Sequence, residues 1–376
     1  MGYSRSRAMT PNRISLLFFT LLSCVGCGFP QVVTSSLDVV KEAKLPKDVY
    51  DVVAVGGPNA AIQCDAEQNI WIPGVRGYSD AVSSLVRFNP GRASLRINID
   101  GDPRFKNGSI ESFSPLQNGG LLALVRTVAE YNKIDGRPTT PKRYADTFAV
   151  AFDASGAISN ATQLKVPLLD EKLTALAQLK NGWLTAGYTD DSATVEVHVH
   201  LFDPAGGLTT EVQLPESRNK ASRTGHAEFA EVFRPTILRT GDGALLVFRG
   251  FTDQSVYSFS VTGQLLGTTK LHPGGIDFWA PRLVGDSLFV HADVSPEKLG
   301  MSGSIPVVRL RSAFPVFDLK TGGITEVMTW MDYGSVGCFD GTHLLLLKQA
   351  NGDSDDSTWR ILTLERAPVK THGPKT

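Results

Sequence analysis

The chain has 376 residues, with 37 basic against 38 acidic side chains and a hydrophobic fraction of 42%. This near-neutral balance gives no field that would attract DNA, so no nucleic-acid partner is expected. The hydrophobic fraction is sufficient for a sizeable core. The 36 glycines and 21 prolines, spread along the chain, suit a protein made of many short strands and turns.

Residues 1–23 predict a signal peptide. Three arginines precede the apolar run 14–22, and small residues follow it, which is the layout of an export signal too short to span a bilayer stably. Leu21-Leu-Ser-Cys24 resembles the bacterial lipobox, whose cysteine is lipidated, and Cys27 is the alternative. We expect an exported protein that is lipid-anchored in the bacterial cell envelope. A soluble periplasmic or secreted protein is the alternative.

The remaining chain divides into a tether at 24–47, one folded body at 48–366 and a flexible tail at 367–376. The folded body contains six turns, each opening onto a short apolar strand. They begin at Asn69, Asn118, Asn181, Asp242, Asp286 and Asp340. An Asn-Gly or Asp-Gly turn between apolar runs is a strong hairpin signal. Recurrence about every 50 residues is typical of an array of similar units.

A second motif lies between these turns, consisting of an apolar strand ending in Phe, a polar residue and a glycine turn. The turn glycines are Gly91, Gly156, Gly206, Gly263 and Gly322. Each unit therefore has four antiparallel strands, as in a β-propeller blade. The sequence predicts an all-β, six-bladed propeller, and a seventh blade fits only if an irregular unit is hidden. The last unit lacks a fourth strand, which 49–55 is expected to supply by pairing the two chain ends.

At residues 69–91, Asn-Ile-Trp-Ile followed by Leu-Val-Arg-Phe-Asn-Pro-Gly resembles the repeat of the NHL and virginiamycin-B-lyase-like superfamily of six-bladed propellers. The resemblance covers about residues 50–365 and implies the fold. The superfamily includes lyases, hydrolases, receptor ectodomains and scaffolds, so it specifies little about function. Its lyase branch uses a metal ion and a catalytic His, but no position here has flanking residues that match. Catalytic residues stay unassigned, and no metal or cofactor is predicted.

In a propeller, the loops joining second to third strands share a face with the loops joining successive blades, and ligands bind there. The predicted second strands end at Arg126, Tyr188, Arg249, His291 and Lys348. If these side chains point toward the channel axis, they form a partial ring of mainly basic residues. Such a ring would suit a carboxylate, a phosphate or a uronic acid, although basic residues also end strands as solvated caps.

The loops between blades add five candidate ligand-binding residues, His226, Glu228, His272, Trp279 and Tyr333. Trp279 and Tyr333 could stack on a flat ligand or simply pack between blades. His198 and His200 alternate along one strand and should share its face, where a solvated position on an outer strand is expected. No spacing supports a zinc site.

Two further features concern the loop face and the ring closure. The long segments 127–147 and 292–312 both follow second strands and are expected to form a rim, a lid or a partner-docking surface. Cys64 and Cys338 lie near the ends of the inner strands of the first and sixth blades. They could form a disulfide in an oxidising compartment, or remain two buried thiols if the strands stand too far apart.

These observations favour a monomeric, non-catalytic module that binds an unknown ligand or protein through its loop face. The alternative is a propeller enzyme of lyase or hydrolase type, acting on a small anionic or carbohydrate-like substrate. Convergence of His226, Glu228, His272, His291 and Arg249 around a polar pocket would favour the enzyme.

Overall fold

The protein is all-β in a computed structural model. The model describes residues 32–46, 62–65, 67, 69–75, 82–89, 93–134, 137–167, 171–190, 194–214, 218–220, 235–249, 254–272, 278–302, 305–332, 334–349 and 359–367. The chain divides into two units, 1–32 and 33–376, and the strands all belong to the second. The predicted lipidation sites, Cys24 and Cys27, lie outside the described residues. Among the described residues, no helix is long and apolar enough to cross a bilayer.

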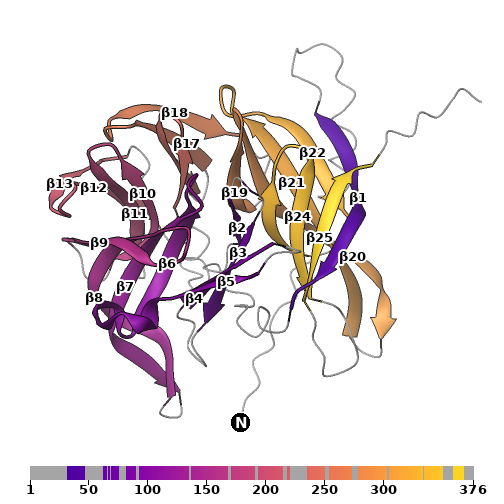
Figure 1. The fold of residues 1–376 in the computed structure, drawn as a ribbon. Helices are drawn as coiled ribbons and strands as arrows, with labels where there is room; N and C mark the ends of the chain where they lie inside the picture. Colours follow the sequence, from indigo (N-terminus) through magenta and orange to yellow (C-terminus); the bar gives the residue numbers. More distant parts are fainter. Residues whose placement is uncertain are drawn as a thin grey trace, which may run out of the picture. The chain divides into compact units, whose positions relative to one another are not determined.

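Four separate antiparallel sheets follow one another along the chain in a propeller-like arrangement (Figure 1). The first comprises β2 (Gln63–Cys64), β3 (Ile70–Val75), β4 (Val82–Phe88) and β5 (Leu95–Asn98). The second comprises β6 (Gly108–Pro115), β7 (Leu121–Ile134), β8 (Arg137–Phe152) and β9 (Ile158–Leu164). Two 3₁₀ turns, η2 (Ile99–Gly101) and η3 (Pro103–Phe105), connect these two sheets.

The third sheet comprises β10 (Lys172–Leu179), β11 (Gly182–Asp190), β12 (Thr194–Phe202) and β13 (Leu208–Glu211), and β14 (Arg218–Lys220) pairs with the beginning of β12. The fourth comprises β15 (Thr236–Thr240), β16 (Gly243–Arg249), β17 (Gln254–Ser260) and β18 (Leu265–Leu271). In these four sheets, apart from β14, each strand pairs with the next one along the chain, as the turn motifs predict.

The fifth sheet has eight strands in the order β19-β20-β21-β22-β1-β25-β24-β23. Their bounds are β19 (Phe278–Val284), β20 (Ser287–Ser302), β21 (Ile305–Asp318), β22 (Ile324–Trp330), β1 (Val33–Lys44), β25 (Trp359–Arg366), β24 (His343–Gln349) and β23 (Ser335–Phe339). The expected six separate four-stranded sheets are therefore not confirmed. What is shown is four sheets and one eight-stranded sheet.

The strand that pairs with β25 comes from the segment expected to be a tether. In Figure 1 the indigo β1 lies beside the yellow β25, and their antiparallel register runs from Leu37↔Arg366 to Lys44↔Arg360. The chain ends do pair, but through 33–44. The segment 49–55, expected in this place, lies outside the described residues. Each part of β1 pairs with a neighbour on one side only, with β22 over 33–36 and with β25 over the rest. Most of its side chains therefore stay in water, and only Leu37 is buried.

Four of the five predicted glycine turns form as expected, and the fifth, at Gly91, lies outside the described residues. The amides of Gly156, Gly206, Gly263 and Gly322 each donate to the carbonyl of the polar residue that follows the Phe. At Gly206, φ is +87°, and an added Cβ would lie 1.9 Å from the carbonyl oxygen of Gln163. Only glycine fits this conformation and this close approach to the neighbouring sheet.

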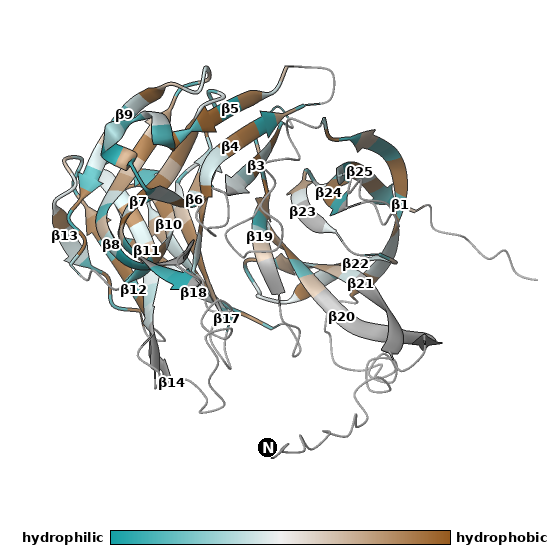
Figure 2. Cartoon of the chain, turned by 90° about the horizontal axis from the view of Figure 1, so that it is seen from below, coloured by the Kyte–Doolittle hydropathy of each residue, from teal (hydrophilic) through white to brown (hydrophobic). Residues whose placement is uncertain are grey.

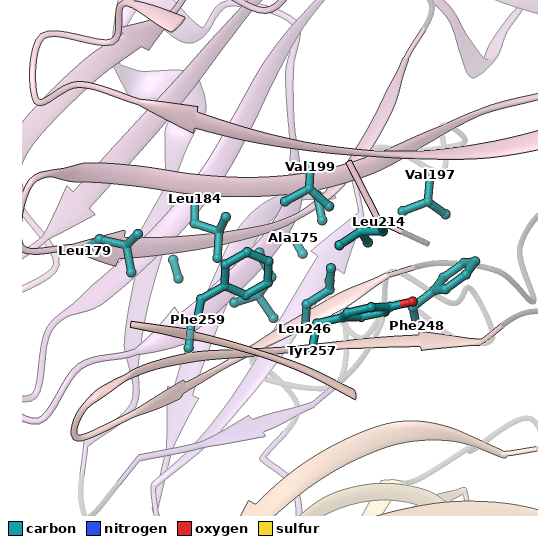
Figure 3. Packing of buried hydrophobic residues seen from close by; sticks show 14 of the residues in the cluster. Ala175, Leu179, Leu184, Val197, Val199, Leu214, Leu246, Phe248, Tyr257 and Phe259 are labelled. Atoms are coloured by element: carbon teal, nitrogen blue, oxygen red, sulfur yellow. The ribbon is translucent and has the colours of Figure 1, made fainter. Parts of the chain in front are cut away.

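The core lies between successive sheets. Figure 3 shows the cluster between the third and fourth sheets, where Leu184 and Val199 face Leu246, Tyr257 and Phe259. Figure 2 shows hydrophobic and hydrophilic residues alternating along the strands, which follows from the two-residue period of a strand. Each fully buried Leu, Val or Phe contributes roughly 1.5–3 kcal/mol, so stacking of sheets supplies most of the stability.

The first and last inner strands meet at a disulfide. Cys64 of β2 and Cys338 of β23 are paired, with their Cα atoms 5.5 Å apart, within the range of ordinary disulfides. Beside them, Arg282 of β19 donates to the carbonyl oxygens of Ile62 and Gly337. Burial lowers the pKa of Arg282 to about 10. The guanidinium of Arg282 thus connects β19 with β23 and with the residue that precedes β2.

The two long segments expected to be loops are mainly paired strands. β7 and β8 continue pairing to Ile134↔Arg137, past the last pairs of their neighbours β6 and β9. β20 and β21 continue to Ser302↔Ile305 in the same way. We call 128–144 the first ribbon and 293–311 the second ribbon. In the second ribbon, the β-branched residues Ile305, Val307 and Val308 favour pairing as a strand.

Candidate functional site

The basic residues predicted to ring the loop face do not all reach it. Arg126, at the end of the predicted second strand, is 1% exposed. Its guanidinium donates to the carbonyl oxygen of Glu171 and to Thr147 Oγ1, and lies 3.7 Å from the ring centroid of Tyr144. Burial lowers the pKa of Arg126. Arg126 therefore connects the second sheet to the third, which removes it from the proposed ligand ring.

Tyr188 and His291 are buried as well, at 1% exposure each. Tyr188 belongs to the cluster between the third and fourth sheets. The imidazole of His291 stacks on Phe314 with a centroid distance of 5.2 Å, and burial lowers the pKa of His291 to about 4. These two side chains pack between strands, so the expected ring does not hold for them either.

Lys348 and His272 are the predicted site residues that remain accessible. Lys348 Nζ forms an ion pair with Asp332 and lies 5.8 Å from the ring centroid of Trp330. His272 is exposed, and its backbone amide donates to Gly322 at 2.9 Å. The two do not converge in any contact that the described residues make.

The other candidates cannot be placed as side chains. His226, Glu228 and Tyr333 lie outside the described residues. Arg249 pairs with Gln254 and Trp279 pairs with His291 in their sheets, but their side chains are not described. The predicted convergence of histidine, acidic and basic groups is therefore untested.

A buried polar cluster, which sequence reasoning missed, lies between the second and third sheets. His200 Nε2 lies 2.9 Å from Glu171 Oε2, and both side chains are wholly buried. Thr185 pairs with His200 across β11 and β12. Glu171 Oε1, His200 Nδ1 and Thr185 Oγ1 have no partner within the described part of the protein. Buried polar atoms without protein partners are typical positions for ordered water.

His198 continues this cluster toward the surface. The rings of His198 and His200 are parallel, with centroids 6.1 Å apart, which confirms that they share one strand face. His198 contacts Thr189 Oγ1 at 3.0 Å and Glu211 Oε1 at 3.2 Å. The prediction that His198 and His200 are solvated is wrong. The second and third sheets pack together beside this pair through a shared apolar cluster. Only the alternation that placed both histidines on one face was readable from the sequence.

A pocket of about 190 Å³ lies next to β1 and contains none of the predicted site residues. It is lined by Lys41, Ala43, Ile70, Asn89, Leu345, Ile361 and Thr363. These residues come from β1, from the first sheet and from the last strands of the eight-stranded sheet. Across the described residues, no group of three or more His, Cys, Asp and Glu side chains is placed to hold a metal ion.

Comparisons with known proteins give likeness of structure only. No family model and no curated protein matches this sequence. Hydrazine synthase of Kuenenia stuttgartiensis is 8% identical, with a TM-score of 0.37 over 77% of this chain and 73% of that chain. A family 117 glycoside hydrolase of Zobellia galactanivorans is 11% identical, with a TM-score of 0.35 over 70% and 86%.

A third solved structure covers more of the chain. It is a Bacteroides fragilis protein described as exported, 9% identical, with a TM-score of 0.41 over 90% of this chain and 100% of that chain. Identities and TM-scores this low carry no argument about what the present chain binds or converts.

Proposed function

We propose that this protein is an exported, six-bladed β-propeller of the NHL-like kind, lipid-anchored in the cell envelope, that binds a ligand or protein without catalysis. The eight-stranded sheet counts as two blades in this proposal. β1 joins them, since it pairs with β22 only from Val33 to Ser36 and with β25 over the rest of its length. Each half then has four strands, like the other sheets.

The observation that carries the binding role is the pair of ribbons. Both arise where a second strand turns into a third, and both extend beyond the strands beside them. A two-stranded ribbon is only marginally stable in water, and the outer edges of its strands can pair with the backbone of another chain. Such edges accept an additional strand or a polar ligand through main-chain hydrogen bonds. Two of them in one protein favour a docking role.

The described side chains of the first ribbon support a polar partner. Glu130, Lys133, Lys142 and Arg143 are all exposed, and Lys142 Nζ lies 2.7 Å from Glu130 Oε1. Exposed ion pairs contribute little stability, about 0–1 kcal/mol. These charges are therefore available to a partner at little cost to the fold.

Site-specific photo-cross-linking tests this role. A photoreactive amino acid replaces Lys133 in the first ribbon, and in a matched variant it replaces Ser155, which is exposed in the turn at the other end of β8. We expect a discrete cross-linked product from position 133 in producing cells and none from position 155. Products of equal yield from both positions, or from position 155 alone, would contradict the proposal.

The anchor has its own test. Mass spectrometry of the mature protein should find an acylated N-terminal Cys24. A mature N-terminus without acyl groups at Cys24 or Cys27 would remove the anchor from the proposal and leave the binding role to the cross-linking result.

A further inference from the structure

The described part of the folded unit begins at one particular end of the eight-stranded sheet. Val33 pairs with Glu326 of β22, two residues after that strand starts. Leu37 pairs with Arg366, whose Nη1 donates to the carbonyl oxygen of Gly341 in the β23–β24 turn at 2.7 Å. The chain therefore enters the sheet at the end where the β21–β22 and β23–β24 turns lie.

This entry point is held by a charged network. Glu326 accepts hydrogen bonds from Ser35 Oγ at 2.7 Å and from Arg366 Nε and Nη2 at 2.8 Å each. The hydrogen bonds from Arg366 lower the pKa of Glu326. A bidentate guanidinium–carboxylate pair is geometrically specific. The beginning of β1 is thus fixed to both of its neighbours, β22 and β25.

The second ribbon leaves the same sheet at its opposite end. β22 pairs with β21 as far as Ser312↔Trp330, and beyond Ser312 only β20 and β21 remain paired, up to Ser302↔Ile305. At about 3.3 Å per residue, four residues of β22 and seven of β21 separate the chain entry from the ribbon tip by roughly 36 Å. The ribbon points away from the entry.

Two exposed apolar side chains lie at the entry, where Val32 and Val33 are 40% and 57% exposed. Val39 and Val40 are exposed as well, but they lie roughly 20–23 Å further along β1. Isolated exposed apolar residues are ordinary, but two in succession where the chain leads toward the proposed anchor suit a surface that a bilayer covers.

The sequence distance to the proposed anchor is short. Cys24 precedes Val33 by nine residues, which span at most about 30 Å when fully extended. We infer that a lipid bilayer lies against the entry end of β1, next to its exposed valines, and that the second ribbon projects away from this bilayer toward its partner. The inference rests on the proposed anchoring at Cys24, and it assigns a side of the protein to the membrane and the other to binding.

Fluorescence quenching on vesicles tests the orientation. The full exported protein, with Cys27→Ser to leave one anchor cysteine, is reconstituted in phosphatidylethanolamine–phosphatidylglycerol vesicles that contain a nitroxide-labelled lipid. A fluorophore is attached through an azide-bearing amino acid that replaces Val33 in one variant and Ser302 in the other. Cys64 and Cys338 are held in their disulfide and do not react with maleimides. Where mass spectrometry shows Cys24 without acyl groups, a maleimide lipid is coupled to its thiol before reconstitution.

We expect the nitroxide lipid to quench the label at position 33 at least threefold more strongly than the label at 302, and a water-soluble nitroxide to show the reverse order. Equal quenching at both positions, or stronger lipid quenching at 302, would overturn the orientation. Because the maleimide lipid supplies an anchor in any case, failure of natural acylation and failure of the orientation give different results.

Discussion

His200 Nε2 lies 2.9 Å from Glu171 Oε2, and neither side chain is exposed to solvent. The pair joins β12 to the segment entering β10, while Arg126 from the neighbouring sheet donates to the backbone of the same Glu171. Buried polar groups cost free energy unless they are hydrogen-bonded. This cluster therefore fixes how the second and third sheets pack.

Replacing His200 with Ala should destabilise the protein by about 3 kcal/mol, because it leaves Glu171 buried without a partner. The measurement is urea unfolding followed by circular dichroism. His343→Ala is the matched control. That histidine contacts Asp340 and Glu365 at the surface, so its loss should cost under about 1 kcal/mol. Equal costs for the two variants would show that the buried pair has no special role.

His291 should make the fold sensitive to acid. Its pKa is lowered to about 4 by burial, against about 6.5 in an unfolded chain. Below pH 6.5 the unfolded state binds the proton more strongly, so stability falls as the pH falls. The loss should reach about 2 kcal/mol at pH 5. His291→Phe should reduce the slope between pH 7 and 5, and an unchanged slope would mean that other groups cause the acid sensitivity.

The disulfide should contribute substantially because it closes a long loop. Cys64 and Cys338 are separated by 274 residues, and loss of such a link costs about 5–6 kcal/mol in the chain-entropy model. Cys64→Ser and reduction of the unmodified protein should lower the unfolding midpoint equally. Reduction should have no further effect on Cys64→Ser. Peptide mapping without reductant that recovers two free thiols would refute the pairing.

Closure by β1 can be tested within one strand. Leu37 is 6% exposed and packs with Phe314 and Leu364, so Leu37→Ala should cost about 2–4 kcal/mol. Val39 is exposed in the same strand, and Val39→Ala should change stability by less than about 0.5 kcal/mol. If both substitutions are neutral, 33–44 does not close the sheet.

The turns were readable from the sequence, because their chemistry is local. Asn or Asp followed by Gly between two apolar runs favours a hairpin, and Gly156, Gly206, Gly263 and Gly322 adopt the positive φ that their own turn motif requires. These turns determine the strand order, so the all-β, propeller-like arrangement could be predicted. The number of separate sheets could not, because it depends on a pairing between distant segments.

The misassigned residues share a different cause. β1 reads as a tether, since Lys41, Glu42 and Lys44 belong to an outer strand with little burial. Arg126 reads as a surface cation, because nothing local reveals that the carbonyl of Glu171, 45 residues away, accepts its hydrogen bond. Burial of a polar side chain depends on what the neighbouring sheet presents, which a single sequence does not encode locally.

The binding role is tested most directly by asking whether both ribbons contact one partner, because both continue from second strands, whose connections to third strands share a face in a propeller. The second ribbon, 293–311, is replaced by an Asn-Gly turn in the protein that carries the photo-cross-linker at position 133. Circular dichroism and the unfolding midpoint should stay unchanged, because the ribbon lies beyond the last pairs of β19 and β22. We predict that the cross-linked product at position 133 falls at least tenfold. A yield equal to that of the unmodified protein would contradict a shared binding face.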